Sequence, residues 1–487
     1  MGLSVAVLER GREILPGQFP KTLRQGMRDF QVDTPLGRTG ERDALFDMRV
    51  NDDISVMVGC GLGGTSLING NVMLKPEAQV YEDAAWPKAL RDEISTRLAD
   101  GYRRAEQMLQ PVAYPGMRQL PKLDALRTAA EALGGDFSLP PINVTFSLDP
   151  AGNHAGVVQP ACTLCGDCCS GCNVGAKNTV AMNYLPDAHA HGAEIFTLAR
   201  VDHIERKGDG WQVVYRQVGK NGGAETLRCR FVVVGAGTLG SSEIMLRSGE
   251  AGLALSLRLG GHFSGNGDVI AFGYNNDRPI NGIGVGDPPV VDGAPVGPVI
   301  AGLIDLRDNL ALKRNMVIQE GAIPSLLAPL LPAIMSGIAP VFGKDTDDGD
   351  FFDEAGRMLK SVVKGAYSGA VHHTQTLLVM SHDDSGGVMQ LDGKRLRLTW
   401  PDAGKRPVFR RISETLRKAT AATGGTYVDN PMWSKALGRN LVTVHPLGGC
   451  RLGDDSDGGV VDHKCRVFDA EGGVHEGLYV IDGSVRP

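Results

Sequence analysis

The chain has 487 residues, of which 42% are hydrophobic and 22% charged, the ordinary balance of a soluble globular protein. This length predicts two or three domains with large cores. The formal net charge of -6 excludes a broad cationic surface, so no nucleic-acid partner is expected. The opening run MGLSVAVLERG does not have the pattern of a signal peptide, because its apolar part is short and ends at the charged Glu9 and Arg10. A cytoplasmic protein is therefore expected.

The N-terminal region carries the first strand and helix signals. Ser4 to Glu9 has the pattern of a short buried strand that ends in an acid. Asp52 to Gly59 predicts a second strand, and it runs into the glycine-rich loop GCGLGGTSLINGNV. Apolar residues at helical spacing then predict helices over Trp86 to Leu109 and over Leu123 to Leu133.

A cysteine cluster follows these helices. Five of the nine cysteines lie between Cys162 and Cys172, which is not the pattern of a disulfide framework. The spacing C-x2-C-x2-C-x3-C is that of bacterial ferredoxin ligands, although Asn173 replaces the usual proline. Three interpretations remain open: an iron–sulfur cluster that relays electrons, a structural zinc ion, or unligated thiols. The four candidate metal ligands are Cys162, Cys165, Cys168 and Cys172.

Two glycine turns have the spacing of a nucleotide-binding loop. Alternating strands are predicted over Ala193 to Asp202 and over Trp211 to Gln217, and the strand RFVVV then enters the second turn. Such turns bring backbone N–H groups and a helix N-terminus to a pyrophosphate. Neither turn is followed by the second strand and acid, about 20 residues on, that complete the fingerprint. The matching glycines are Gly59, Gly61 and Gly64, and Gly235, Gly237 and Gly240.

The stretch from Gly321 to Gly343 contains no charged residue. It is long enough to resemble a membrane span, but its four prolines break a regular helix, so no transmembrane helix is predicted. We expect an apolar loop or lid with short helices, which would also suit the wall of a pocket for a lipid-like substrate. Beyond it, Arg410 to Ala422 is predicted to be helical, and the chain from Val442 onward to be strand and loop.

Four separated blocks resemble the glucose–methanol–choline (GMC) oxidoreductase family, nearest to its cholesterol-oxidase-like members. They are SVAVLERG, GCGLGGTSLINGNV, the run from GAKNTVAMNYL through RFVVVGAGTLGSSEIML, and the C-terminal pair VHPLGGC and LYVIDGS. The resemblance implies an α/β fold, with a Rossmann-like FAD-binding domain of the glutathione-reductase type interleaved with a substrate domain. The substrate domain is expected to contain a mainly antiparallel sheet. The FAD-binding domain would comprise 1–80, 160–275 and 440–487, and the substrate or cap domain 81–159 and 276–439.

The same resemblance assigns cofactor roles residue by residue. Glu9 would bind the adenosine ribose, and Val201 would contact the adenine through its backbone. The glycine-rich loop would lie along the isoalloxazine and the pyrophosphate, and the second turn would allow close approach to FAD. The C-terminal DGS would hold the diphosphate–ribitol end. The remaining residues carried over are Gly63, Gly64, Asn69, Gly70, Gly235, Gly237, Asp482 and Gly483.

Two residues are candidates for the catalytic chemistry. Oxidation of an alcohol by a flavin moves a hydride from the carbinol carbon to N5 and needs a group that takes the hydroxyl proton. His445, in HPLGG, matches the active-site histidine of the family, and the usual histidine pKa suits this task. Glu320 stands as an isolated carboxylate at the mouth of the uncharged stretch, where a raised pKa would allow it to act as a base. His372 and His373 are interpreted as structural.

Both ends of the chain depart from the family pattern. Only eight residues precede Glu9, whereas the phosphate-binding turn sits about 20 residues before the ribose-binding acid in this fold. We therefore expect that roughly 25–30 residues, with the first strand and the phosphate loop, are absent. The chain also stops at Pro487, before the second polar residue of the family's active site, an Asn or His, and before its last helix. Weak or absent FAD binding by the chain as given is expected.

The leading hypothesis is an FAD-dependent oxidoreductase acting on the CH–OH group of a sterol or another bulky apolar alcohol. The electron acceptor would be dioxygen if the cysteines are unligated, and a quinone or a redox protein if they hold an iron–sulfur cluster. A nicotinamide-dependent dehydrogenase that uses the second glycine turn is a further alternative, disfavoured by the missing acid. A third hypothesis is that the chain is an inactive fragment or an electron carrier built on the cysteine cluster.

Overall fold

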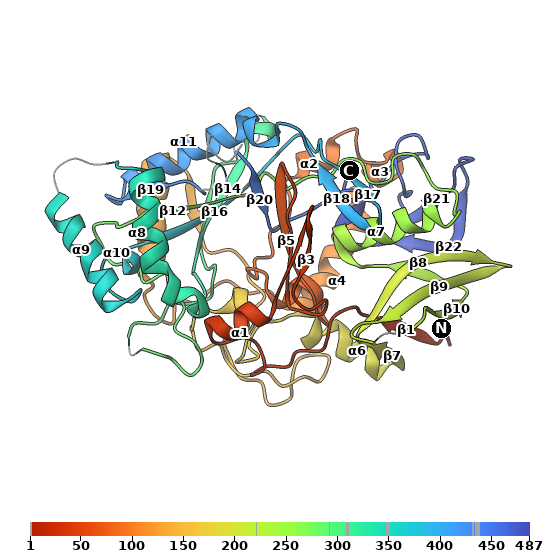
Figure 1. Ribbon diagram of the computed structural model, residues 1–487, viewed down its shortest axis with the longest axis horizontal. Helices are drawn as coiled ribbons and strands as arrows, with labels where there is room; N and C mark the ends of the chain where they lie inside the picture. The colour runs from red at the N-terminus through yellow and green to blue at the C-terminus, as the bar shows by residue number, and fades with distance from the viewer. Residues whose placement is uncertain are drawn as a thin grey trace.

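The computed structural model describes residues 2–220, 222–291, 293–307, 311–346, 351–430, 433 and 439–487. The molecule is elongated, and its two halves contain different sheets (Figure 1). The half that holds both chain ends has short parallel pairings, and the other half has one large antiparallel sheet. The chain passes between the halves more than once, as the α/β fold with interleaved domains predicts.

The parallel pairings join segments that are far apart in the sequence. The predicted strand at the N-terminus is β1 (Val5–Leu8), and it pairs with β7 (Ala193–Phe196). Likewise β11 (Val232–Val234) pairs with β22 (Val474–Val480) near the C-terminus. Helix α7 (Gly237–Glu250) begins directly in the second glycine turn, as predicted. Valine is the main residue of these strands, and its branched side chain favours extended backbone.

An antiparallel ribbon, one further short strand and three short helices complete this half. Its core contains Val234, Met245 and Leu478, and also Tyr81 and Trp86 from the segment that was expected to belong to the cap domain. Helix α2 (Ala78–Glu82), which carries Tyr81, and the turn with Trp86 that follows it therefore pack against the half that holds both chain ends, which we call the cofactor half. The elements are β8 (Ala199–Lys207), β9 (Gly210–Gln217), β10 (Glu225–Cys229), β21 (Arg466–Phe468), α2 (Ala78–Glu82), α3 (Lys88–Asp92) and α6 (Tyr184–Ala190).

A five-stranded sheet lies between the two halves in the ribbon view (Figure 1). Its order is β20-β5-β4-β2-β3, and β20 is parallel to β5 although nearly the whole chain separates them. The predicted strand before the first glycine loop is thus β5. The bounds are β2 (Phe30–Thr34), β3 (Gly37–Thr39), β4 (Phe46–Arg49), β5 (Ile54–Gly59) and β20 (Leu441–Thr443).

The far half is built on a seven-stranded sheet whose pairings are all antiparallel, as predicted. Helices α5 (Pro121–Leu133) and α11 (Pro407–Ala421) contribute Leu126 and Ile412 to its main core. Strand β12 joins this sheet, although residues up to 275 were expected in the FAD-binding domain. In order, the strands are β15 (Gly343–Lys344), β19 (Thr426–Val428), β12 (Val269–Tyr274), β16 (Gln375–Ser381), β14 (Met316–Gly321), β13 (Leu303–Asp305) and β6 (Asp136–Ser138).

The uncharged stretch forms a helical run at the end of the far half. A 3-10 helix, η6 (Ser325–Leu330), leads into α8 (Leu331–Phe342), with α9 (Phe351–Lys364) and α10 (Gly369–His372) beside it (Figure 1). By length and composition alone, Ser325–Phe342 could cross a membrane, but the core helix of a soluble protein passes the same test. The remaining elements are α1 (Leu23–Arg28), η1 (Gly64–Leu67), α4 (Ala99–Leu109), β17 (Val388–Asp392) and β18 (Arg395–Thr399).

Candidate active site

Strand pairing brings His445 to the first glycine loop. The parallel register of β20 on β5 places Thr443 opposite Val56, and both strands run toward the same edge of the sheet. Beyond that edge, β5 continues into the loop that contains Gly63, and β20 continues into the HPLGG turn. Because parallel strands end side by side, the catalytic and flavin-loop motifs meet there despite their separation in sequence.

A buried carboxylate holds His445. The Nδ1 atom of its imidazole lies 2.7 Å from Oδ1 of Asp268, and the His445 side chain remains 39% exposed. The other oxygen of Asp268 accepts hydrogen bonds from the Thr443 hydroxyl and the Val444 N–H, at 2.8 and 2.9 Å. Burial lowers the pKa of His445, but the charge of Asp268 and its hydrogen bond outweigh burial and raise that pKa. With the proton on Nδ1, Nε2 is left to accept a proton from a substrate.

The loop before β12 fixes Asp268 in turn. A second carboxylate, the half-buried Asp383, accepts the N–H groups of Gly265 and Gly267, each at 3.0 Å. Gly267 has a φ of +60°, and a Cβ there would meet the Ser381 carbonyl oxygen at 2.7 Å, so only glycine fits. The loop is therefore rigid where it presents Asp268 to His445, a connection that the sequence did not indicate.

The predicted ribose and flavin segments are also in contact. A Cβ on Gly11 would lie 2.4 Å from the Gly61 nitrogen, so the turn after β1 packs directly on the glycine loop. The Glu9 carboxylate, at the end of β1, accepts the Gly11 N–H at 2.5 Å, and burial raises its pKa. The backbone oxygen of Glu9 accepts the Ala199 N–H, which places the start of β8, with Val201, beside it.

The second glycine turn meets the C-terminal segment. Asp482 accepts the Gly237 N–H at 2.8 Å, at the first turn of α7. The N–H of Gly448, in the HPLGG turn, donates to the Gly483 carbonyl at 3.0 Å. A Cβ on Gly237 would meet no atom within 4 Å, and one on Gly235 would meet only an Ile481 side-chain carbon at 3.9 Å. The backbone at these glycines is thus open to close approach, as the cofactor prediction requires.

The far end of the first loop carries an unpartnered polar group. Asn71 is 1% exposed, and neither polar atom of its side chain has a hydrogen-bond partner in the part of the chain that the structure describes. Such buried groups are normally satisfied. Asn69 and Gly70 lie directly before it, on the loop expected to bind the flavin. A bound cofactor with polar edges fits this site, because it would supply the missing partner for Asn71.

Lys177 anchors the same loop from behind. Its buried ammonium donates to the backbone oxygens of Leu67, Asn69 and Cys168, at 3.2, 2.8 and 3.1 Å. These three acceptors match the three donors of an ammonium group. Burial lowers the pKa of Lys177. The lysine therefore joins the flavin loop to the cysteine cluster, although the sequence placed it only within a family block.

The expectation of an isolated carboxylate at Glu320 is wrong. Glu320 lies on β14 with no exposed surface, and Oε2 is 2.9 Å from the ammonium of Lys122, which is also fully buried. Its Oε1 atom accepts the N–H groups of Ala301 and Gly302 at 2.7 and 2.9 Å. Burial does raise the pKa of Glu320. Both oxygens are nevertheless engaged, which fits a structural ion pair better than a general base.

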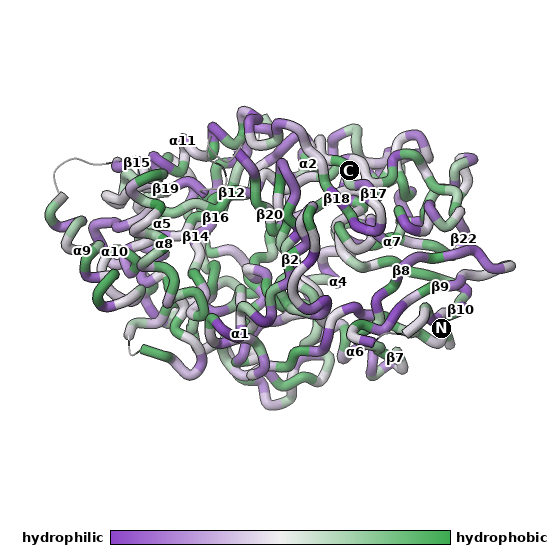
Figure 2. Tube along the Cα trace, viewed as in Figure 1, coloured by the Kyte–Doolittle hydropathy of each residue, from purple (hydrophilic) through white to green (hydrophobic). Residues whose placement is uncertain are grey.

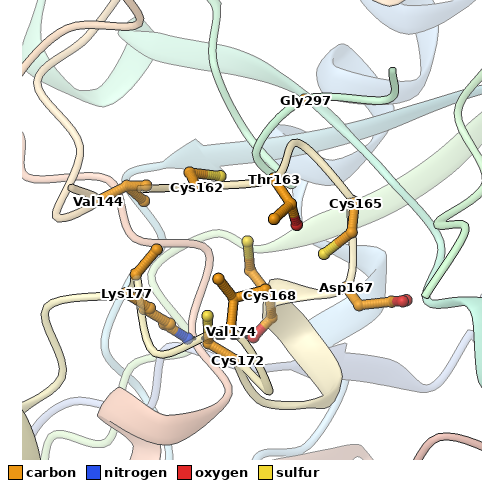
Figure 3. Close-up of a pocket in the computed structure, with 12 residues that line it drawn as sticks. Val144, Cys162, Thr163, Cys165, Asp167, Cys168, Cys172, Val174, Lys177 and Gly297 are labelled. Carbon is orange, nitrogen blue, oxygen red and sulfur yellow. Dashed lines mark hydrogen bonds between the residues drawn. The ribbon is translucent and has the colours of Figure 1, made fainter. Parts of the chain in front are cut away.

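The four predicted metal ligands line one small cavity, to which Asp167 and Lys177 also contribute (Figure 3). Burial raises the pKa of Cys162 to about 12 and also raises that of Cys172. Burial therefore favours the neutral thiol at Cys162 and Cys172. Within the described residues, no three His, Cys, Asp or Glu side chains are placed to hold a metal ion, so the structure adds no support to the zinc interpretation. The iron–sulfur interpretation stays a prediction.

Some functional residues were missed by the sequence reasoning. Asp268 and Asp383 sit in glycine-rich turns, where an aspartate is usual and signals no pairing with a distant histidine. Conversely, His373 has a structural contact, as expected: its Nδ1 lies 2.7 Å from the Asn276 carbonyl oxygen, at the end of α10.

Solved structures identify the class to which this fold belongs. A fungal aryl-alcohol oxidase matches with a TM-score of 0.56 at 14% identity, over 100% of this chain and 91% of that one. An FAD-dependent oxidoreductase of Chaetomium thermophilum matches with a TM-score of 0.53 at 13% identity, over 100% and 91%. The chain therefore shares the overall fold of these two enzymes.

Family comparison gives the particular group. The N-terminal GMC oxidoreductase model matches residues 42–260, and the C-terminal model matches residues 405–487. The chain belongs to the GMC oxidoreductase family, as the sequence motifs implied, and is a flavin-dependent alcohol oxidoreductase.

Curated relatives extend the similarity over the whole chain. It is 25% identical to a cholesterol oxidase of Mycobacterium tuberculosis, over 99% of this chain and 83% of that protein. A cholesterol oxidase of Acinetobacter baumannii is 24% identical, over 99% and 86%. A long-chain-alcohol oxidase of Arabidopsis thaliana is 22% identical, over 100% and 61%.

Proposed function

We propose that this protein oxidises the CH–OH group of a sterol or another bulky apolar alcohol. The observation that carries the proposal is the His445–Asp268 pair, 2.7 Å apart, next to the glycine loop of a GMC fold. The residues proposed to hold FAD are Glu9, Gly63, Gly64, Asn69, Gly70, Val201, Gly235, Gly237, Asp482 and Gly483.

The chemistry divides between cofactor and protein. Bound FAD supplies the acceptor for the hydride that leaves the carbinol carbon. His445 takes the hydroxyl proton on Nε2, and Asp268 keeps the other proton on Nδ1 and stabilises the imidazolium that forms. The Asp383-bound loop holds Asp268 in place during this transfer. Glu320 has no part in the proton transfer, because Lys122 and two backbone N–H groups already occupy it.

The curated relatives favour an apolar alcohol as the substrate, because they include cholesterol oxidases and a long-chain-alcohol oxidase. The names of these relatives favour dioxygen as the electron acceptor.

Because weak FAD binding is expected, the test begins with the purified protein in excess FAD and with its visible absorption spectrum. Anaerobic addition of cholesterol or of a long-chain primary alcohol is expected to bleach the bands of bound flavin. The His445→Gln variant should retain flavin and reduce it at least 100-fold more slowly, since general acid–base catalysis typically contributes 10²–10⁴-fold. His373→Gln is the matched control and should behave like the unaltered protein. A flavin-loaded protein that none of these alcohols reduces would refute the proposal.

A second candidate function is an iron–sulfur dehydrogenase that passes electrons to a quinone or a redox protein. The favouring observation is that Cys162, Cys165, Cys168 and Cys172 line one cavity at ferredoxin-like spacing (Figure 3). An iron–sulfur cluster is larger than a single metal ion, so the thiolates that ligate it lie farther apart than the ligands of one ion. Lys177 would link this cavity to the flavin loop through Cys168 and Asn69.

Elemental analysis separates the two candidates. Iron and acid-labile sulfide bound in stoichiometric amounts, and lost in a Cys165→Ser variant, would support the dehydrogenase. Hydrogen peroxide formed in step with alcohol oxidation by an iron-free protein would support the oxidase. A protein with neither flavin nor iron would leave the inactive fragment as the surviving interpretation.

A further inference from the structure

The η6–α8 run is apolar on both of its faces. Its inner face buries Leu331, Met335 and Ala339 in a cluster with residues of the large sheet. Its outer face is open: Ile334 is 46% exposed and Val341 is 70% exposed. A helix that is apolar all round is normally buried on every side. The other large apolar residues exposed on this face are Leu327 and Leu330.

The neighbouring helix α9 extends this apolar surface. Leu359 and Val363, one turn apart, are 66% and 72% exposed, and Val362 beside them is also exposed. Lys360 and Lys364 are exposed on the same helix. Helix α9 contacts α8, and both lie at one end of the long axis of the molecule, where Figure 2 colours much of α8 as hydrophobic. We call the exposed surface of η6, α8 and α9 the apolar face.

The chemistry of the apolar face suits lipid better than protein. A protein interface carries about one hydrogen bond per 100–200 Å² and a polar rim. The eighteen residues Ser325–Phe342 offer no charged side chain, and their helical backbone groups are largely engaged within the helices. Apolar side chains that enter a bilayer need no hydrogen-bond partners there. Lysines beside an apolar helix face, as on α9, are typical of helices that lie in the membrane interface.

A membrane span does not fit this helix. About a third of Ser325–Phe342 is buried against the protein, including Leu331 and Met335 in the core cluster. Leaving that cluster to cross a bilayer would expose the apolar sheet behind it, at about 25 cal/mol for each Å². The outer side chains can enter the headgroup and acyl boundary while the inner side chains stay in place.

We infer that the apolar face docks on the surface of a lipid bilayer. In that position Ile334, Val341 and Val363 enter the acyl boundary, and Lys360 and Lys364 reach the phosphates. The inference rests on the proposed function in one respect: an apolar alcohol resides in membranes, so the enzyme would meet its substrate there. Docking itself requires only the residues of this face.

Vesicle sedimentation tests the inference without any turnover. The full chain is incubated with vesicles of phosphatidylcholine, with and without phosphatidylglycerol. We expect it to bind both, and to bind more tightly when the anionic lipid is present. The variant Ile334→Glu/Val341→Glu should lose at least tenfold in vesicle affinity. Leu257→Glu is the matched control, because Leu257 is fully exposed while its neighbours Leu255 and Leu259 pack against the core of the cofactor half, away from this face. The control should bind like the unaltered protein.

A second variant separates charge from apolar contact. Lys360→Glu/Lys364→Glu should remove the gain from phosphatidylglycerol and leave binding to pure phosphatidylcholine within about twofold, since basic residues act through the anionic surface. No sedimentation with either vesicle would overturn the inference. It would also fail if analytical ultracentrifugation found a dimer that Ile334→Glu dissociates, because a second copy would then cover the face.

Turnover of a small water-soluble alcohol separates this inference from the proposed function. If docking is right, Ile334→Glu/Val341→Glu should oxidise the soluble alcohol at the unaltered rate while losing vesicle binding. If the proposed function is wrong, vesicle binding persists although no alcohol reduces the flavin.

Discussion

His445 depends on Asp268 in two ways. The carboxylate orients the imidazole through the 2.7 Å contact to Nδ1, and it raises the pKa of the ring against the lowering effect of burial. A base with a raised pKa becomes neutral, and therefore active, only as the pH rises through that value. The acid limb of the pH–rate profile should thus report His445 directly.

Asp268→Asn should change this profile in a defined direction. Without the negative charge, burial is the remaining influence, so the pKa of His445 falls and the acid limb moves to lower pH. We also expect kcat/KM to drop at least 100-fold, because an amide can stabilise the wrong tautomer. Measurement of kcat/KM from pH 5 to 9 checks both effects, and an unmoved acid limb would contradict the assignment. The conservative Asp268→Glu variant should restore part of the rate.

Glu320 provides the contrasting case of a buried carboxylate with a structural role. Removing one partner of a buried pair typically costs 3–5 kcal/mol, since the other charge is left uncompensated. Glu320→Gln should therefore lower the free energy of unfolding by about 3 kcal/mol, measured by denaturant titration. Lys122→Met/Glu320→Leu should recover most of that loss, because neither charge remains. A rate loss in Glu320→Gln without any loss of stability would favour the base interpretation instead.

Among the elements, the first glycine loop is held in part by one side chain from elsewhere in the chain, Lys177. Lys177 donates to Leu67, Asn69 and Cys168, so η1 and the cysteine segment share one anchor. A substitution that displaces either segment should then also displace the other.

Lys177→Met tests this anchor. The methionine fills a similar volume but leaves three buried carbonyl groups without their donor, so we expect a loss of about 3 kcal/mol in unfolding free energy. Flavin should also dissociate faster from the variant. Lys88→Met is the control, since the Lys88 side chain is 71% exposed and its pair with Asp92 is a surface one. Equal stability of the two variants would show that the anchor is unimportant.

Single elements were predicted well where the pattern is local. Helices α5 and α11 carry regular apolar spacing, and the structure places them at Pro121–Leu133 and Pro407–Ala421. The longer helix expected over Trp86 to Leu109 is divided into α3, a π-helical turn and α4. Its N-terminal part packs through Trp86 into the cofactor half, a tertiary contact that periodicity alone does not contain.

At the scale of the whole molecule, a buried charge network links the N-terminal turn to the five-stranded sheet. Asp47 on β4 is 2.8 Å from Arg10 and 2.9 Å from Arg49. Burial alone would raise the pKa of Asp47, but the two arginines outweigh it and lower the pKa to about 2. Arg10 directly follows the proposed ribose-binding Glu9, so the network also positions that segment.

The pH dependence of stability follows from this lowered pKa. The stabilisation is complete above the ordinary value of 3.8, and it is lost as the pH falls toward 2. Its size is about 2 kcal/mol, at 1.36 kcal/mol for each pKa unit. Asp47→Asn should reduce the unfolding free energy at pH 7 by about 3 kcal/mol and flatten its slope between pH 4 and 2. Asp402→Asn, at an exposed pair with Lys405, is the control and should change stability by less than about 1 kcal/mol.

The sequence by itself determined the family and the fold class, because these depend on short motifs whose order along the chain survives without coordinates. The catalytic role of His445, which the same motifs predict, stays a prediction. The domain bounds, the FAD-contact residues and the cytoplasmic location stay predictions. Only the tertiary structure decided that Asp268 supports His445, that Glu320 is already paired, and that α8 keeps an apolar face outward. Each of these depends on groups that are distant in sequence and adjacent in space. The spacing of apolar residues can predict a helix, but it does not indicate which other residues cover each face of that helix.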